Sequence, residues 1–334
     1  MIFVTGANGL IGSFVCRRLL KEGYRIKALK RGTSNLNLVE DIKDEINWVE
    51  GDLLNLSELS SCLDGVKQIV HCAALVSYDS RDENILHRTN VDGTANLVNI
   101  ALEKKIELFL HLSSVASIGK EKHETTSTEE TQWFESNSTT AYARSKHQSE
   151  MEIWRGYAEG LNAIIINPSL VLGPGDLAKS STQLFKYIYD EKNFYTGGIV
   201  NYVDVRDVAE IVFKLMSSQH FGERYIVNAG STTYKELFDS IAHAMGKNPP
   251  QIKVEGLAIK LAIVFEKIRS RLSGSKPIVS DELEQVSQNK HTYDNSKIKQ
   301  AVNVNFRSLN DTIVWTSDQL LKRLSSGNTM QLKN

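Results

Sequence analysis

Residues 2–12 have the sequence IFVTGANGLIG, and this stretch decides the fold. The apolar run Ile2–Thr5 is typical of a buried strand, and the pattern from Leu10 to Lys21 is typical of a helix. Glycines at positions 6, 9 and 12 allow a tight turn and close approach of the backbone to a pyrophosphate, while the helix N-terminus supplies free N–H groups. The stretch therefore predicts a dinucleotide-binding loop. The residues predicted to contact the cofactor there are Gly6, Asn8, Gly9, Leu10, Ile11 and Gly12.

The same strand-then-helix alternation continues through the first half of the chain. Short apolar runs at 25–29, 46–50, 68–72, 108–113 and 163–167 alternate with helical patterns at 56–63, 84–104 and 141–158. Unbroken runs of Val, Ile and Leu are typical of parallel strands that are buried on both faces. The repeated β-α-β order predicts an α/β fold of the Rossmann type, with a doubly wound parallel sheet and right-handed crossovers.

The alternation loosens after Pro168, which predicts a division of the chain. We expect a dinucleotide-binding domain over 1–168, to which 199–228 returns, and a smaller, mostly helical substrate domain over 169–198 and 229–325. Asp204 is placed to cap a helix that runs to about Met216. Residues 326–334 are predicted to be a flexible tail.

Composition excludes several classes of protein. The 334 residues carry a net charge of −1, so the chain lacks the basic surface expected for binding nucleic acid or an anionic membrane. Three cysteines without paired spacing favour a reducing compartment and no zinc site, and no metal is expected. Without a signal-like N-terminus or 18 consecutive apolar residues, the chain is predicted to be cytoplasmic and not integral to a membrane.

The end of the second strand indicates which nicotinamide cofactor binds. An acidic residue there would accept hydrogen bonds from the ribose 2′-hydroxyl, but Lys30 and Arg31 occupy the place. Cations suit a 2′-phosphate, which favours NADP, with NAD as the alternative. In the other interpretation, both are solvated loop charges. Asp52, after the third strand, is placed to accept from an adenine amino group or to cap its own loop.

Tyr142 and Lys146 are the candidate catalytic pair. They are four residues apart on a predicted helix and therefore project from one face. An ammonium beside a phenol stabilises the phenolate, which would make Tyr142 a usable acid or base at neutral pH.

Together these motifs resemble the extended short-chain dehydrogenase/reductase family, also called the NAD-dependent epimerase/dehydratase family, over nearly the whole chain. The resemblance rests on the glycine loop, Gly51-Asp52-Leu53, His71-Cys-Ala-Ala74, Asn90-Val-Asp-Gly-Thr94, Ser113-Ser114…Gly119, Tyr142-x-x-x-Lys146, Asn167-Pro-Ser-Leu-Val-Leu-Gly-Pro174 and Tyr202-Val-Asp-Val-Arg-Asp207. The further cofactor contacts that it implies are Leu53, Ala73, Ala74, Tyr142, Lys146, Pro168, Ser169 and Val171.

The resemblance also implies catalytic roles. Tyr142 would donate or accept the proton, and Lys146 would bind the nicotinamide ribose while lowering the pKa of Tyr142. Ser114 would hold the substrate oxygen. It is preferred to Ser113 because it stands five residues before Gly119, and only one of two adjacent side chains can face the cofactor. Asn90 would support a proton relay, or would be a polar group without that role.

Three branches of the family differ at a few positions. Dehydratases carry Asp-Glu after the active hydroxyl, where this chain has Val115 and Ala116. Epimerases carry an Arg where this chain has Val200. Arg206 could take the place of that arginine; in the other interpretation, Arg206 forms a salt bridge at a helix start. The chain most resembles the dihydroflavonol-reductase-like and hydroxysteroid-dehydrogenase-like branch. This implies an NAD(P)-dependent oxidoreductase that interconverts an alcohol and a ketone or aldehyde; the alternative is a nucleotide-sugar epimerase with tightly bound NAD.

Several features would shape the substrate site. Trp133, Phe134 and Tyr78 are candidate wall residues, and the apolar segment 256–272 is predicted to be a helix that packs in the smaller domain, covers the substrate or lies on a membrane. The family resemblance implies a homodimer formed through the helices at 92–104 and 141–158.

Overall fold

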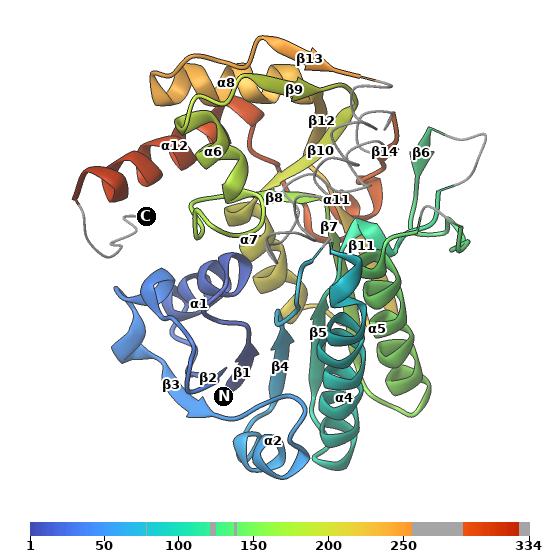
Figure 1. The fold of residues 1–334 in the computed structure, drawn as a ribbon. Coiled ribbons are helices and arrows are strands. Elements are labelled where there is room, and N and C mark those ends of the chain that lie inside the picture. Colours follow the sequence, from blue (N-terminus) through green and yellow to red (C-terminus); the bar gives the residue numbers. More distant parts are fainter. Residues whose placement is uncertain (78, 121–124, 137–138, 256–289, 327–334) are drawn as a thin grey trace.

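A seven-stranded parallel sheet forms the centre of the computed structural model, which describes residues 1–77, 79–120, 125–136, 139–255 and 290–326 (Figure 1). The strand order is β11-β7-β5-β4-β1-β2-β3, and every pairing in the sheet is parallel. The strands are β1 (Ile2–Thr5), β2 (Ile26–Lys30), β3 (Asn47–Glu50), β4 (Gln68–His71), β5 (Leu108–Leu112), β7 (Ala163–Pro168) and β11 (Glu223–Val227). The predicted Rossmann-type fold is confirmed.

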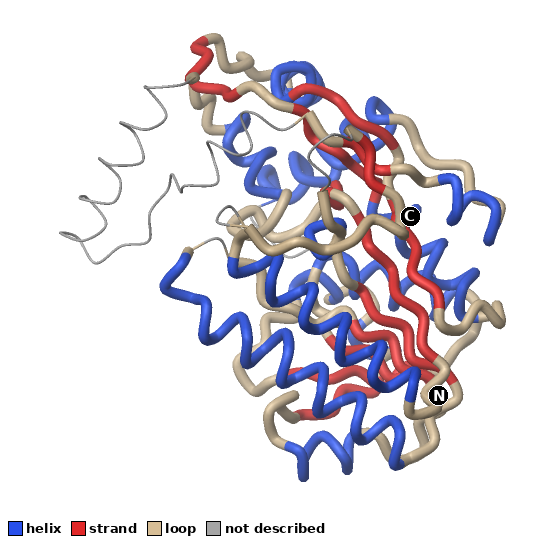
Figure 2. The backbone as a smooth tube through the Cα atoms, turned by 90° about the vertical axis from the view of Figure 1, so that its right-hand side faces the viewer, coloured by secondary structure: helices blue, strands red, loops and turns tan. Residues whose placement is uncertain are grey.

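Helices cover both faces of the sheet because its strands are apolar on both faces (Figures 1 and 2). The side chains of Ile2 and Val4 pack with the helices α1 (Leu10–Lys21) and α7 (Val205–Met216). Phe3, between them in β1, points to the other face. That face is covered by α2 (Leu56–Cys62), α4 (Gly93–Glu103) and α5 (Ala141–Ala158). Two hydrophobic cores therefore hold the sheet in place.

Smaller sheets surround a third core, at the top of Figure 1. Its strands are β8 (Leu170–Leu172), β10 (Ile199–Asp204) and β12 (Gly230–Thr233), and a further pair joins β9 (Phe194–Thr196) to β13 (Ile252–Val254). A separate pair joins β6 (Thr126–Ser127) to β14 (Thr292–Tyr293), whose Tyr293 packs in a small cluster with Ile118 and Ile226. The helices there are α6 (Thr182–Tyr189), α8 (Tyr234–Met245) and α12 (Leu309–Ser326), while α11 (Ser296–Val302) packs near β11. Of the segment 199–228, β11 joins the large sheet, whereas β10 pairs with β8 and β12.

One predicted helix is interrupted. Residues 84–104 were expected to form a continuous helix, but α3 (Glu83–Leu86) passes into a π-helical turn, η4 (His87–Asp92), before α4 begins. Such turns place an extra residue in the helix and redirect side chains. Here the turn contains Asn90, whose buried amide lies within hydrogen-bonding distance of two other segments.

Two other predictions can be compared with the structure. The side chain of Asp204 accepts a hydrogen bond from Arg206 N at 2.7 Å, so Asp204 does cap α7. Within the described ranges, no helix has the length and apolar character needed to cross a bilayer. The segment 256–272, with its three possible interpretations, lies outside the described residues.

Candidate active site

A cavity of about 2960 Å³ runs along the carboxyl ends of the strands and reaches α5 and the smaller sheet. Ligands of open α/β sheets bind at this edge. Typical pockets for small ligands measure about 300–1,000 Å³, so this one has room for a dinucleotide and a second molecule. All the predicted cofactor residues line it: Gly6, Asn8, Gly9, Leu10, Ile11, Gly12, Lys30, Arg31, Asp52, Leu53, Ala73, Ala74, Tyr142, Lys146, Pro168, Ser169 and Val171.

The glycine loop has the close packing that a pyrophosphate site requires. Gly6 has a φ of +66°, and a Cβ there would lie 2.7 Å from Ala73 N. A Cβ on Gly12 would overlap the carbonyl oxygen of Gly6. Gly9 caps α1 without any side-chain hydrogen bond, which leaves the first N–H groups of the helix free of a side-chain acceptor. These features fit the phosphates of a dinucleotide.

We predict that Gly12→Val weakens binding of NADPH by at least about tenfold, because the added side chain displaces the loop from its helix. Gly65→Val is the matched control, since Gly65 also resists substitution, with a φ of +74°, yet does not line the cavity. Fluorescence titration with NADPH measures the affinity, and thermal melting measures the strain. Equal affinities in the two variants would contradict this function of the loop.

The adenosine end of the cavity carries both predicted cations. Lys30 Nζ lies 3.8 Å from a carboxylate oxygen of Glu50 on the neighbouring strand, so its charge is already partly balanced. Arg31 is exposed, and its guanidinium has no partner among the residues that the structure describes. Asp52 accepts a hydrogen bond from Leu54 N at 2.9 Å and therefore caps its own loop, as one of the two interpretations expected.

Ser114, Tyr142 and Lys146 meet at the centre of the cavity. Ser114 precedes the short helix η5 (Val115–Ser117), and its hydroxyl is hydrogen-bonded to that of Tyr142 near the start of α5. Lys146, one turn further along α5, is only 1% exposed and donates from Nζ to the carbonyl of Leu112 at 2.9 Å. The helix begins at Thr140, whose side chain accepts from Ala143 N.

Burial shifts the pKa of both Tyr142 and Lys146. Burial raises the pKa of Tyr142 above its usual value, and the hydrogen bond with Ser114 opposes part of that rise. The Nζ of Lys146 donates to the carbonyl of Leu112, and the expected lowering of the Tyr142 pKa by this ammonium stays a prediction. Burial also lowers the pKa of Lys146 to about 8, against the opposing charge of Glu150.

The two adjacent serines have different partners. Ser113 is buried and lies 3.2 Å from the hydroxyl of Ser117, whereas Ser114 is the one that reaches Tyr142. Asn90 is not among the residues that line the cavity. Its side-chain amide forms two hydrogen bonds with the backbone of Leu75: Oδ1 accepts from Leu75 N at 2.7 Å, and Nδ2 donates to the Leu75 carbonyl oxygen at 2.9 Å. Nδ2 also donates to Ser145 Oγ. Asn90 therefore fixes a loop beside the cavity.

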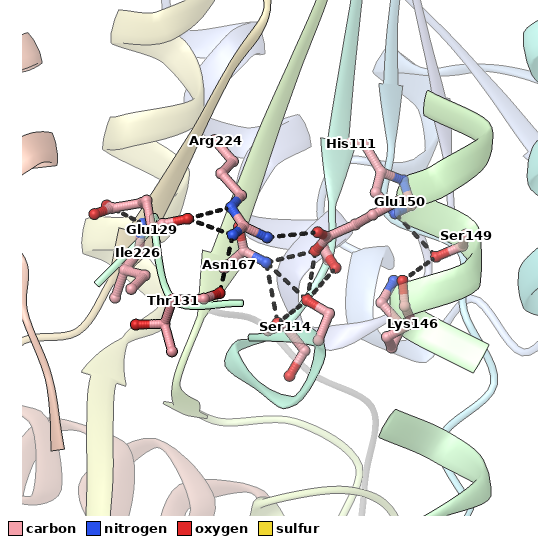
Figure 3. Close-up of polar contacts among 12 residues, drawn as sticks. His111, Ser114, Glu129, Thr131, Lys146, Ser149, Glu150, Asn167, Arg224 and Ile226 are labelled. Atoms are coloured by element: carbon pink, nitrogen blue, oxygen red, sulfur yellow. Dashed lines mark hydrogen bonds and ion pairs between the residues drawn. The ribbon is translucent and has the colours of Figure 1, made fainter. Parts of the chain in front are cut away.

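Sequence reasoning missed Glu150. It lies on α5 one turn after Lys146, its side chain is fully buried, and it binds Ser117 and Asn167 (Figure 3). The spacing Lys146-x-x-x-Glu150 was a readable signal, since residues four apart share a helix face. Its partners were not readable, because they come from segments distant in sequence.

The remaining candidates divide between the cavity and the scaffold. Trp133, Phe134 and Val200 line the cavity, and Trp133 stacks on His147 with ring centroids 4.3 Å apart. Tyr78 lies outside the described residues. Arg206 forms an ion pair with Asp204 at 2.6 Å at the start of α7, which is the helix-start salt bridge considered above. Over the described ranges, no group of three or more His, Cys, Asp or Glu side chains is arranged to hold a metal.

Residues 2–230 match the model of the NAD dependent epimerase/dehydratase family, so the chain belongs to that family and is an enzyme. A Synechocystis sp. protein provisionally named dihydroflavonol 4-reductase is 30% identical over 307 residues, covering 89% of this chain and 88% of its own. Cinnamoyl-CoA reductase 1 of Petunia hybrida is 27% identical over 241 residues, covering 68% and 72%. The crystal structure of gox2253 superposes with a TM-score of 0.83 at 28% identity, covering 97% and 98%. The resemblance drawn from the motifs is confirmed.

Proposed function

We propose that the protein is an NADP-dependent reductase that converts an apolar or aromatic ketone or aldehyde to its alcohol, with Tyr142 as the proton donor. The observation that carries the proposal is the hydrogen bond between Ser114 and Tyr142 inside the cavity, one helical turn from Lys146. Val115 and Ala116, which follow the serine, have no group that moves a proton, so the arrangement suits redox chemistry and not elimination.

The proposed catalytic role of each residue follows from the chemistry of its side chain. A bound nicotinamide cofactor supplies the hydride. Ser114 donates to the substrate oxygen as negative charge develops on it, and Tyr142 transfers its phenolic proton to that oxygen. Lys146 binds ribose hydroxyls and stabilises the phenolate that remains. Ser169 also faces the cavity, and its buried hydroxyl has no partner among the described residues, so it is available to a bound cofactor.

The cavity walls support an apolar substrate. Val76, Ile85 and Phe134 line it while remaining 42%, 53% and 63% exposed, and Val200 adds apolar surface where a diphosphate would need cations. Arg206, the possible replacement cation, is paired with Asp204. The names of the Synechocystis and Petunia relatives, with dihydroflavonol and cinnamoyl-CoA in them, favour an aromatic carbonyl compound.

The test is turnover of NADPH, followed by its absorbance, with a panel of aliphatic and aromatic aldehydes and ketones. We expect oxidation of NADPH with aromatic carbonyl compounds and slower oxidation of NADH. No turnover across the panel, together with NAD released from the denatured protein, would replace this proposal by the nucleotide-sugar epimerase.

The reverse reaction should depend on pH. Since burial raises the pKa of Tyr142, the phenolate needed to accept a proton is scarce at neutral pH. We expect kcat/KM for alcohol oxidation to rise by up to about tenfold per unit between about pH 6 and 9. A profile that stays flat over this range in the unmodified enzyme would argue against proton acceptance by Tyr142.

We also propose a homodimer with α4 and α5 at its interface. These helices pack against each other on one side of the sheet, and Met151 and Tyr157 of α5 remain 42% and 44% exposed. Sedimentation velocity should give the mass of two chains, and Met151→Glu should shift it toward one. A monomeric unmodified protein would exclude this assembly.

A further inference from the structure

A buried carboxylate lies behind the candidate catalytic residues. The side chain of Glu150 is fully buried on α5, and Figure 3 shows it between Arg224, Asn167 and the turn that carries Ser114. Its Oε1 accepts hydrogen bonds from Ser117 Oγ and from Asn167 Nδ2, both at 2.5 Å. Burying a charge is unfavourable unless partners compensate it, so this constellation requires an explanation.

The two groups that donate to Glu150 also contact Ser114. Asn167 Nδ2 carries two N–H groups and can donate to Glu150 and, at 3.1 Å, to the carbonyl oxygen of Ser114 at the same time. Ser117 Oγ lies 2.6 Å from the same oxygen, and its single proton goes to one of the two acceptors. Glu150 therefore orients the amide of Asn167, which fixes the backbone at Ser114, and contacts the hydroxyl of Ser117 beside it. Because the hydroxyl of Ser114 reaches Tyr142, the position of the carboxylate sets the geometry of that hydrogen bond.

Glu150 is also the carboxylate that acts on Lys146. The titratable groups that interact with this ammonium from the surrounding elements are His71, Cys72, His111 and Glu150. Burial and the charge of Lys146 lower the pKa of His71 to about 3 and hold the pKa of His111 well below its usual value. Burial raises the pKa of Cys72, so at neutral pH the two imidazoles and the thiol are uncharged.

Arg224 forms an ion pair with Glu150 but does not donate a hydrogen bond to it. Its Nη1 lies 3.6 Å from Oε2, beyond hydrogen-bonding distance, and its Nε donates to the carbonyl of Glu129 at 2.8 Å (Figure 3). Within the described part of the chain, Oε2 of Glu150 has no hydrogen-bond partner. Because residues four apart share a helix face, Glu150 and Lys146 lie on the same side of α5.

We infer that Glu150 is a positioning residue with two functions: it fixes the Ser114 turn through Ser117 and Asn167, and it supplies the charge that keeps Lys146 cationic in a buried site. The inference deepens the proposed function and rests on it for its catalytic meaning. The placement of the carboxylate can nevertheless be tested without cofactor or substrate.

The first test isolates the charge. Glu150→Gln keeps an oxygen acceptor for Ser117 and Asn167 but removes the charge. NMR titration of protein with ¹³C,¹⁵N-labelled lysine, with Lys146 assigned by its loss in Lys146→Met, should show its pKa falling by about one unit in Glu150→Gln. The matched control is Glu152→Gln on the same helix, where the carboxylate pairs with Arg155 at 2.9 Å, and it should change nothing. An unchanged titration of Lys146 in Glu150→Gln overturns the inference.

The second test isolates the positioning. Ser117→Ala removes the hydroxyl that lies between Glu150 and Ser114 but leaves the charge in place. We expect kcat for reduction to fall by about tenfold with the titration of Lys146 unaltered. In Glu150→Gln, by contrast, the alkaline limb of kcat/KM should move to lower pH together with the pKa of Lys146. A Ser117→Ala enzyme with full kcat overturns the positioning function. If the protein turns over no carbonyl compound at all, the NMR result still decides the electrostatic function.

A double variant covers the case in which Glu150→Gln folds but is too unstable for the NMR titration. If the carboxylate balances Lys146, its loss should be tolerated better when the ammonium is also absent. The drop in Tm caused by Glu150→Gln should therefore be smaller in the Lys146→Met background than in the unmodified protein. Equal destabilisation in both backgrounds would show that Glu150 acts only on its other partners and would overturn the inference.

Discussion

Replacement of Tyr142 by phenylalanine is expected to lower kcat/KM for carbonyl reduction by about 10²–10⁴, the usual range for loss of a general acid. The ring remains and fills the same space at the start of α5, so the fold and the cofactor site should be preserved. The hydroxyl that is hydrogen-bonded to Ser114 is lost, and with it the proton for the product oxygen. Stopped-flow or steady-state loss of NADPH absorbance measures the effect, and the Kd for NADPH should change by less than about threefold.

A second tyrosine on the same helix provides the control. Tyr157 is 44% exposed, lies against Gly222 and does not line the cavity. Tyr157→Phe should retain the full rate. If Tyr142→Phe also retained the full rate, another group would have to supply the proton. The proposed mechanism would then be wrong, although the enzyme would still be a reductase.

The sequence predicted the parts of this site that depend on local order. The glycine loop follows β1 and precedes α1, so its place was determined by the strand-to-helix alternation. Tyr142 and Lys146 share a face of α5 because four residues make slightly more than one turn. The choice of Ser114 over Ser113 came from the family resemblance, through its distance of five residues to Gly119. Each of these predictions used residues that are neighbours along the chain.

What the sequence did not predict depends on contacts between distant segments. The pKa of Tyr142 rises because of burial, and the direction taken by the ammonium of Lys146 depends on the carbonyl of Leu112, 34 residues away. The environment of Glu150 combines Ser117, Asn167 and Arg224 from three elements. The π-helical turn contains Asn90, whose amide bonds to Leu75 and Ser145 in other segments of the chain.

Cofactor choice should change when Arg31 is replaced by glutamate. Lys30 is already within 3.8 Å of Glu50, whereas the guanidinium of Arg31 has no partner in the described part of the chain and lines the cavity after β2. A 2′-phosphate would gain a charge-assisted hydrogen bond from Arg31, while a carboxylate at that place would repel it and accept from a ribose hydroxyl instead. We expect the ratio of kcat/KM for NADPH to that for NADH to fall by about a hundredfold in Arg31→Glu.

The control for this charge reversal lies at the other end of the same strand. Arg25 precedes β2, is exposed and does not line the cavity, so Arg25→Glu makes the same change in net charge away from the predicted phosphate site. It should leave the ratio within about twofold at 0.15 M salt, where charges more than about 8 Å apart are largely screened. A ratio that is unchanged in Arg31→Glu would mean that Arg31 is a solvated loop charge. A fall of equal size in both variants would mean that net charge, and not contact with a phosphate, sets the preference.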